Sequence, residues 1–177
     1  MGFDGRERTL RNRAGRLLLV NLWASWCAPC LVELNQFTAR YPELKAHGID
    51  VVALSVDGLG NDKTALEDAS KLVVQRKFPF PVGQATPSVM ANLKDLHNLQ
   101  IPLQKGDELP LPSSFLIDDR GRLAVIYKGP LSVDELLKDI THSDRSRRER
   151  FARAAPIAGQ PINHPQVERT AVNSAGF

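Results

Sequence analysis

Cysteine is scarce in this chain of 177 residues, which has only Cys27 and Cys30. Small secreted proteins held together by disulfides carry more cysteines at wider spacing, so this class of protein is excluded. A structural zinc site needs further ligands, and the histidines lie singly along the sequence, at positions 47, 97, 142 and 164. The sequence therefore predicts no metal site and no cofactor beyond the cysteine pair itself.

Long apolar runs are also missing. No run approaches the ~20 residues that cross a bilayer, and we expect no membrane segment in this chain. Residues 1–16 are polar and rich in arginine, so we expect no signal peptide either. The net charge of +3 comes from the two ends, because residues 17–143 hold 12 Lys and Arg against 15 Asp and Glu. We interpret the basic ends as solvated segments and expect no nucleic-acid partner.

The sequence does contain a regular alternation of apolar patterns. Short apolar runs at 17–23 and 49–56 are typical of strands buried on both faces of a sheet. Elsewhere apolar residues recur every three or four positions, which indicates helices, and Pro42 predicts a kink or a restart. The order strand, helix, strand, helix, strand, helix, hairpin, helix predicts an α/β fold with a central mixed sheet. Further helices are expected at 64–76, at 86–96 and from 132 onward. A short strand is expected at 80–83, and a hairpin is expected from strands at 114–117 and 123–128.

The apolar periodicity fades at about residue 143, and Pro156, Pro161 and Pro165 interrupt the remainder of the chain. We therefore predict one domain over residues 1–142 and a basic, proline-punctuated tail or linker over residues 143–177.

The two cysteines lie at the junction between the first predicted strand and its helix. Backbone N–H groups at a helix start stabilise an anion, so the pKa of Cys27 is expected below the usual ~8.5. Cys30 lies one turn further on, where a disulfide can close, and Pro29 restricts the backbone between them. This arrangement predicts thiol–disulfide exchange, in which Cys27 attacks a substrate disulfide and Cys30 resolves the mixed disulfide. Two structural cysteines, or half of a metal site, are the alternatives.

Two segments carry a family resemblance. Residues 21–30, NLWASWCAPC, followed by Glu33, resemble the active-site motif of the extracytoplasmic, TlpA-like group of thioredoxin-like proteins. Residues 111–118, LPSSFLID, resemble the segment that holds the cis-proline of that family. The resemblance covers about residues 3–142, with a strand–helix insertion at 59–84. It implies a thioredoxin fold, an enzyme that reduces protein disulfides, an upstream dithiol donor and an extracytoplasmic location.

The resemblance also assigns roles to residues around the cysteines. Pro112 would be the cis-proline that faces the dithiol, and the backbone at Leu111 would pair with an extended substrate segment. Trp26 would shield the dithiol and form part of the docking surface. Trp23 is expected in the core.

Asn21 stands where ordinary thioredoxins carry a buried aspartate. Because asparagine cannot ionise, another group or a water molecule must take the proton from Cys30. Glu33, one turn after Cys30, is a candidate, and a surface helix carboxylate is the equally open alternative. Asp57, just after the second strand, is a weaker candidate for this role than Glu33.

Other readings of the function stay open. Residues 100–109 form a longer polar loop than relatives have, and we hypothesise that this loop shapes the choice of partner. The chain could instead be a docking or redox-sensing module of a larger multidomain protein. A thiol peroxidase is disfavoured, because only Ser25 precedes Cys27 as a hydroxyl to stabilise peroxide. The direction of the reaction, reduction or oxidation, is not fixed by Ala28 and Pro29.

Overall fold

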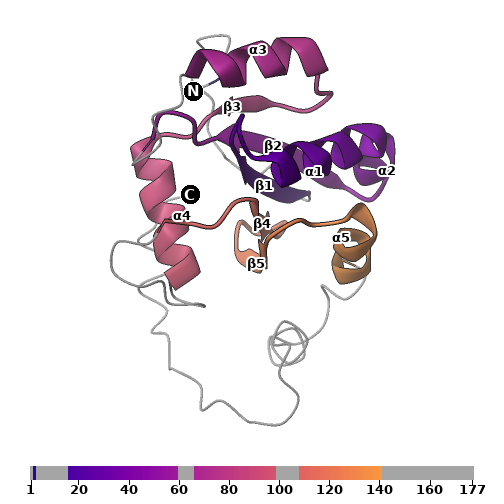
Figure 1. Ribbon diagram of the computed structural model, residues 1–177. Coiled ribbons are helices and arrows are strands. Elements are labelled where there is room, and N and C mark those ends of the chain that lie inside the picture. Colours follow the sequence, from indigo (N-terminus) through magenta and orange to yellow (C-terminus); the bar gives the residue numbers. More distant parts are fainter. Residues whose placement is uncertain (1, 3–15, 60–65, 99–107, 141–177) are drawn as a thin grey trace.

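One five-stranded sheet organises the molecule. The computed structural model describes residues 2, 16–59, 66–98 and 108–140. The strand order is β3-β2-β1-β4-β5 (Figure 1), in which β1, β2 and β3 are parallel. Strand β4 runs antiparallel to β1, and β5 antiparallel to β4, so the predicted mixed sheet with a terminal hairpin is confirmed. The strands are β1 (Leu17–Trp23), β2 (Ile49–Ser55), β3 (Val82–Gln84), β4 (Ser113–Ile117) and β5 (Leu123–Lys128).

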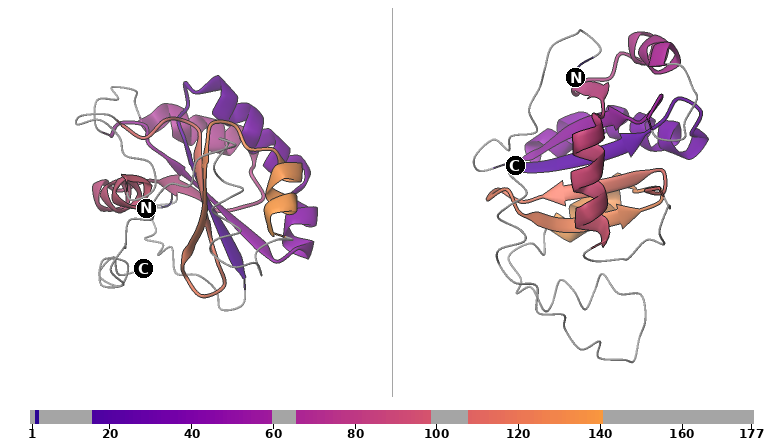
Figure 2. Two further views of the ribbon diagram at one scale, coloured as in Figure 1. Left: turned by 90° about the horizontal axis from the view of Figure 1, so that it is seen from below. Right: turned by 90° about the vertical axis from the view of Figure 1, so that its left-hand side faces the viewer.

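Helices cover both faces of this sheet. Helix α4 lies on one face, and α1, α2 and α5 lie on the other (Figure 2). Helix α3 contributes Ala69 to the same apolar cluster as α1, α2 and α5. The expected thioredoxin fold, with a helix after the hairpin, is confirmed. The helices are α1 (Ala28–Ala39), α2 (Tyr41–Ala46), α3 (Leu66–Arg76), α4 (Pro87–Asn98) and α5 (Val133–Ile140).

Strand β1 lies at the centre of the sheet and sends its side chains alternately to the two faces. Leu18, Val20 and Leu22 belong to the apolar cluster under α4. Leu19 and Trp23 belong to the cluster under α1, and Trp23 is fully buried, as predicted. Asn21 has the parity of Leu19 and Trp23, so its amide lies on the α1 side. This parity brings a polar group into the layer that also holds the cysteines.

Proline and aromatic residues explain where two elements differ in detail from expectation. Helix α1 ends at Ala39 and α2 begins at Tyr41, with Pro42 in its first turn, so the helix restarts. The strand expected at 80–83 is wrong in its bounds, because β3 begins only at Val82. Phe80 instead packs with its ring stacked on Phe78 and edge-on to Tyr41.

Side-chain caps begin two of the helices as the sequence indicates. Glu135 accepts a hydrogen bond from the backbone N–H of Ser132, and Ser132 accepts one from that of Glu135, which is a capping box. Thr86 accepts a hydrogen bond from the N–H of Val89 at the start of α4. The cap expected at Thr64, most of the loop at 100–109 and the tail from 143 lie outside the described residues.

Candidate functional site

The two cysteines form a disulfide at the start of α1. Cys27 is the N-cap residue, and Pro29 occupies the first turn of the helix. The Cys27–Cys30 bond joins residues whose Cα atoms are 5.2 Å apart, and the backbone N–H of Cys30 donates to Cys27 Sγ at 3.3 Å. Both residues are buried, Cys30 completely. The sequence expectation that the pair lies at a helix start, close enough to bond, is therefore confirmed.

The segment before β4 contains the cis peptide bond that the resemblance implied. Among the described residues, the Leu111–Pro112 bond is cis and no other is. Two hydrogen bonds hold this segment in place. Ser113 Oγ donates to the carbonyl of Pro110 at 2.6 Å. The N–H of Gly129 also donates to the carbonyl of Pro112 at 2.9 Å. Leu111 is half-buried and packs against the apolar cluster that includes both cysteines.

The two tryptophans near the disulfide have opposite environments. Trp23 is 0% exposed and packs edge-on against Phe78. Trp26, the residue before Cys27, is 57% exposed. A large aromatic side chain exposed to this extent beside a reactive disulfide is suited to contact another protein.

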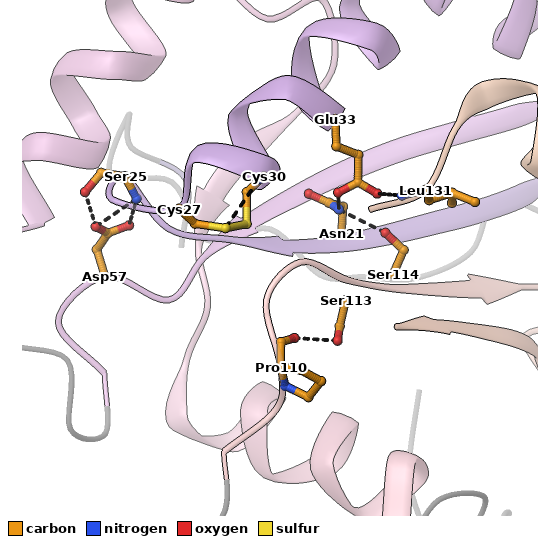
Figure 3. The surroundings of a disulfide bond; sticks show 10 residues. All are labelled: Asn21, Ser25, Cys27, Cys30, Glu33, Asp57, Pro110, Ser113, Ser114 and Leu131. Atoms are coloured by element: carbon orange, nitrogen blue, oxygen red, sulfur yellow. Dashed lines mark hydrogen bonds between the residues drawn. A yellow bond between two sulfur atoms is a disulfide. The ribbon is translucent and has the colours of Figure 1, made fainter. Parts of the chain in front are cut away.

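A buried polar network lies behind Cys30. Asn21 uses both hydrogens of Nδ2, donating one to Glu33 Oε2 at 3.0 Å and one to Ser114 Oγ at 2.9 Å. The backbone N–H of Leu131 donates to Glu33 Oε1 at 3.0 Å. Glu33 is 1% exposed, so the alternative of a surface carboxylate is wrong. Figure 3 shows Asn21, Glu33, Ser114 and Leu131 together on one side of the disulfide.

Burial controls the protonation of Glu33. Desolvation raises the pKa of Glu33 from its ordinary 4.5 to about 7, against the lowering effect of the hydrogen bonds from Leu131 and Asn21. A carboxyl group with this pKa exchanges protons near neutral pH. Glu33 and Cys30 are three residues apart in one helix, which places them on the same face.

Asp57 forms a second buried carboxylate site, on the other side of the disulfide in Figure 3. It accepts hydrogen bonds from the backbone N–H and the hydroxyl of Ser25, and from the hydroxyl of Ser55. Because the Ser25 hydroxyl donates its hydrogen to Asp57, that hydrogen is not available to bind a peroxide at Cys27. Ser25 was the one hydroxyl considered for a peroxidase reaction at Cys27.

The sequence did not reveal the distant partners of Asn21 and Glu33. Ser114 faces Asn21 in the β1–β4 register, and Leu131 follows the hairpin. Both contacts join residues more than ninety positions apart, and the β1–β4 pairing could have indicated only the contact between Asn21 and Ser114. Within the described residues, no group of three or more His, Cys, Asp and Glu side chains could hold a metal ion. No helix in these ranges is long and apolar enough to cross a membrane.

The chain is similar in sequence to proteins of known chemistry. A model of the AhpC/TSA family matches residues 2–126. The thiol-disulfide oxidoreductase ResA of Bacillus thuringiensis subsp. konkukian is 28% identical over 148 residues, which span 78% of this chain and 71% of that protein.

Solved structures are similar in fold. StoA from Bacillus subtilis has a TM-score of 0.57 at 20% identity, covering 77% of this chain and 90% of that chain. The exposed lipoprotein thioredoxin Etrx1 from Streptococcus pneumoniae has a TM-score of 0.61 at 20% identity, covering 80% of this chain and 96% of that chain.

Proposed function

The chain belongs to the AhpC/TSA family and is a thiol–disulfide oxidoreductase with a thioredoxin fold, and on this premise we propose that it reduces disulfide bonds in other proteins. The observation that carries this proposal is the Cys27–Cys30 disulfide at the first turn of α1. Family membership alone does not fix the substrate, so the proposal depends on the groups around the sulfurs.

Cys27 is the attacking sulfur in this proposal. Its side chain lies at the N-cap, where unpaired N–H groups and the helix dipole stabilise a thiolate. The Cys30 N–H, which donates to Cys27 Sγ, supplies one such hydrogen bond. The thiolate attacks one sulfur of the substrate disulfide, forms a mixed disulfide and expels the other substrate sulfur as a thiolate.

Cys30 then resolves the mixed disulfide. Glu33, as a carboxylate, takes the proton from the Cys30 thiol, either directly or through a water molecule. The Cys30 thiolate attacks Cys27 Sγ, closes the Cys27–Cys30 disulfide and releases the second substrate thiolate. The pKa of Glu33, about 7, suits a group that both takes up and gives back a proton. An upstream dithiol donor then reduces the disulfide for the next cycle.

The substrate is an extended protein segment in this proposal. The backbone at Leu111, next to the cis bond to Pro112, pairs with that segment as a short strand. Trp26, exposed beside Cys27, contacts the same partner.

We also propose an extracytoplasmic location, which the TlpA-like motif and the fold likeness to an exposed lipoprotein support. Fractionation of cells would test it, and recovery of the protein in the cytosol would contradict it.

Insulin reduction with dithiothreitol as the electron donor tests the activity. The wild-type chain should precipitate the insulin B chain faster than dithiothreitol alone, and Cys27→Ser should abolish this gain. Cys30→Ser should accumulate mixed disulfides with insulin, visible as an added mass on a non-reducing gel. Equal trapping by both variants would contradict the assigned roles.

A wild-type protein that can be oxidised and reduced at Cys27 and Cys30 but does not reduce insulin would instead be a docking or redox-sensing module.

The redox midpoint against glutathione tests the direction of the reaction. A midpoint above about −150 mV, in the range of strong disulfide-forming oxidants, would contradict a reductant.

A further inference from the structure

Asp57 is a fully buried carboxylate that the thiol chemistry above does not use. Its two oxygens, Oδ1 and Oδ2, accept the backbone N–H of Ser25 at 3.1 and 3.0 Å, and Oδ1 also accepts the Ser25 hydroxyl. Ser55, at the end of β2, donates its hydroxyl to Asp57 Oδ2 at 2.5 Å. One carboxylate thus binds Ser25 through both its backbone and its side chain, and holds it to the end of β2.

Ser25 is a central residue of the turn that carries the nucleophile. The N–H of Cys27 donates to the carbonyl of Ala24 at 3.1 Å, which closes a turn with Ser25 and Trp26 at its centre. Ala24 and Cys27 at the two ends of the turn are buried, whereas Trp26 is 57% exposed. Holding Ser25 inward therefore leaves Trp26 projecting outward beside the disulfide.

Exposing a large apolar side chain such as tryptophan is unfavourable in the free protein, but the same side chain can stabilise a complex with another protein. Tryptophan is among the residues that contribute most to protein–protein binding. Each side chain or loop that must be ordered on association weakens binding, and ordering it beforehand removes this cost. A small disulfide needs access to Cys27 only and gains nothing from the placement of Trp26.

We propose that Asp57 is a positioning residue which, through Ser25, holds Trp26 in place for binding protein substrates. The inference rests on the proposed function, and it adds a residue that affects the recognition of protein disulfides and leaves the reactivity of the sulfurs unchanged. The Ser25–Asp57–Ser55 contacts around the buried Asp57 carry it, since they fix the backbone immediately before Trp26.

The test compares a protein substrate with a small one. For Asp57→Ala we expect KM for insulin to rise about three- to tenfold with kcat within about twofold, because one loop and its side chain must be ordered on binding. The rate with bis(2-hydroxyethyl) disulfide should stay within about twofold of wild type. Ser25→Ala, which keeps the hydrogen bond from the backbone N–H, should show a smaller rise in KM for insulin. Ser25→Thr, which keeps a hydroxyl group, should have a KM close to that of wild type.

A double-mutant cycle separates positioning from general destabilisation. If Asp57 acts through Trp26, adding Asp57→Ala to Trp26→Ala should raise KM no further. Asp118→Ala is the matched control, because this mostly buried carboxylate also holds a turn, by accepting the N–H groups of Arg120 and Arg122. That turn follows β4 at the opposite end of the sheet from Cys27, since Ile117 pairs with Leu18 near the start of β1. Asp118→Ala should therefore lower stability without changing KM.

Three results would overturn the inference: an equal loss of rate with both substrates, additive effects of Asp57→Ala and Trp26→Ala, or the same rise in KM from Asp118→Ala. Should Asp57→Ala not fold, Ser25→Ala decides the question, and an unchanged KM for insulin would count against the proposal. Failure of the proposed function would look different, because the wild-type chain itself would then not turn over insulin.

Discussion

Replacing Glu33 by glutamine should remove a pH dependence of stability that the wild-type protein carries. Glu33 is buried among Asn21, Ser114 and Leu131, and burial raises its pKa to about 7 from the ordinary 4.5. The folded state therefore holds this proton more tightly than the unfolded state does. Stability from Glu33 is fully present below pH 4.5 and is lost as the pH rises through 7.

The size of the effect depends on these two pKa values. Between pH 5 and pH 8, ionisation of Glu33 should lower the free energy of unfolding by about 2.5 kcal/mol, at ~1.36 kcal/mol per pKa unit. Glu33→Gln cannot ionise and should lose none of this. The variant itself should cost about 1 kcal/mol at pH 5, because one oxygen must replace two as acceptor for Leu131 and Asn21.

Urea unfolding of the oxidised protein at the two pH values measures this difference. In the oxidised form neither cysteine titrates, so the thiols add nothing to the pH dependence. Glu135→Gln is the control, because hydrogen bonds from Ser132 lower the pKa of Glu135, away from this pH range. An identical loss of stability between pH 5 and pH 8 in wild type and Glu33→Gln would refute the buried, proton-holding role of Glu33.

Two further substitutions probe the same structure. Asn21→Asp should raise the pKa of Cys27, measured by thiolate titration of the reduced protein, because it adds a carboxyl group next to the buried Glu33. It should also lower stability at pH 8, because the new carboxylate takes the place of an amide whose Nδ2 is 3.0 Å from Glu33 Oε2, and two adjacent carboxylates cannot both ionise without cost. An unchanged titration would contradict the burial of this site. Ser132→Ala should cost about 1 kcal/mol in urea unfolding through loss of the capping box of α5, and insulin turnover should not change. A loss of turnover in the Ser132→Ala variant would show that α5 affects the site.

Short-range patterns explain the parts of the structure that the sequence predicted correctly. The capping box at Ser132 and Glu135, the restart at Pro42 and the buried run of β1 each depend on neighbouring residues. The bounds of β3 were wrong because Phe80 packs against aromatic rings, one of them from the distant Tyr41. No local pattern distinguishes an apolar residue in a strand from one in such a cluster.

The sequence by itself determined the dithiol. Cys27, Pro29 and Cys30 lie within four positions at a strand-to-helix junction, and local geometry alone brings the two sulfurs together at a helix start. Only the tertiary structure decided that Glu33 and Asp57 are buried and which groups they bind. Glu33 is buried because distant segments pack around it, with Ser114 of β4 beside Asn21 and Leu131 lying 98 positions after Glu33 in the chain. This burial raises the pKa of Glu33, although the hydrogen bonds from Leu131 and Asn21 lower it. Burial and hydrogen bonding are set by which distant segments pack around a group, and that information is spread over the whole chain.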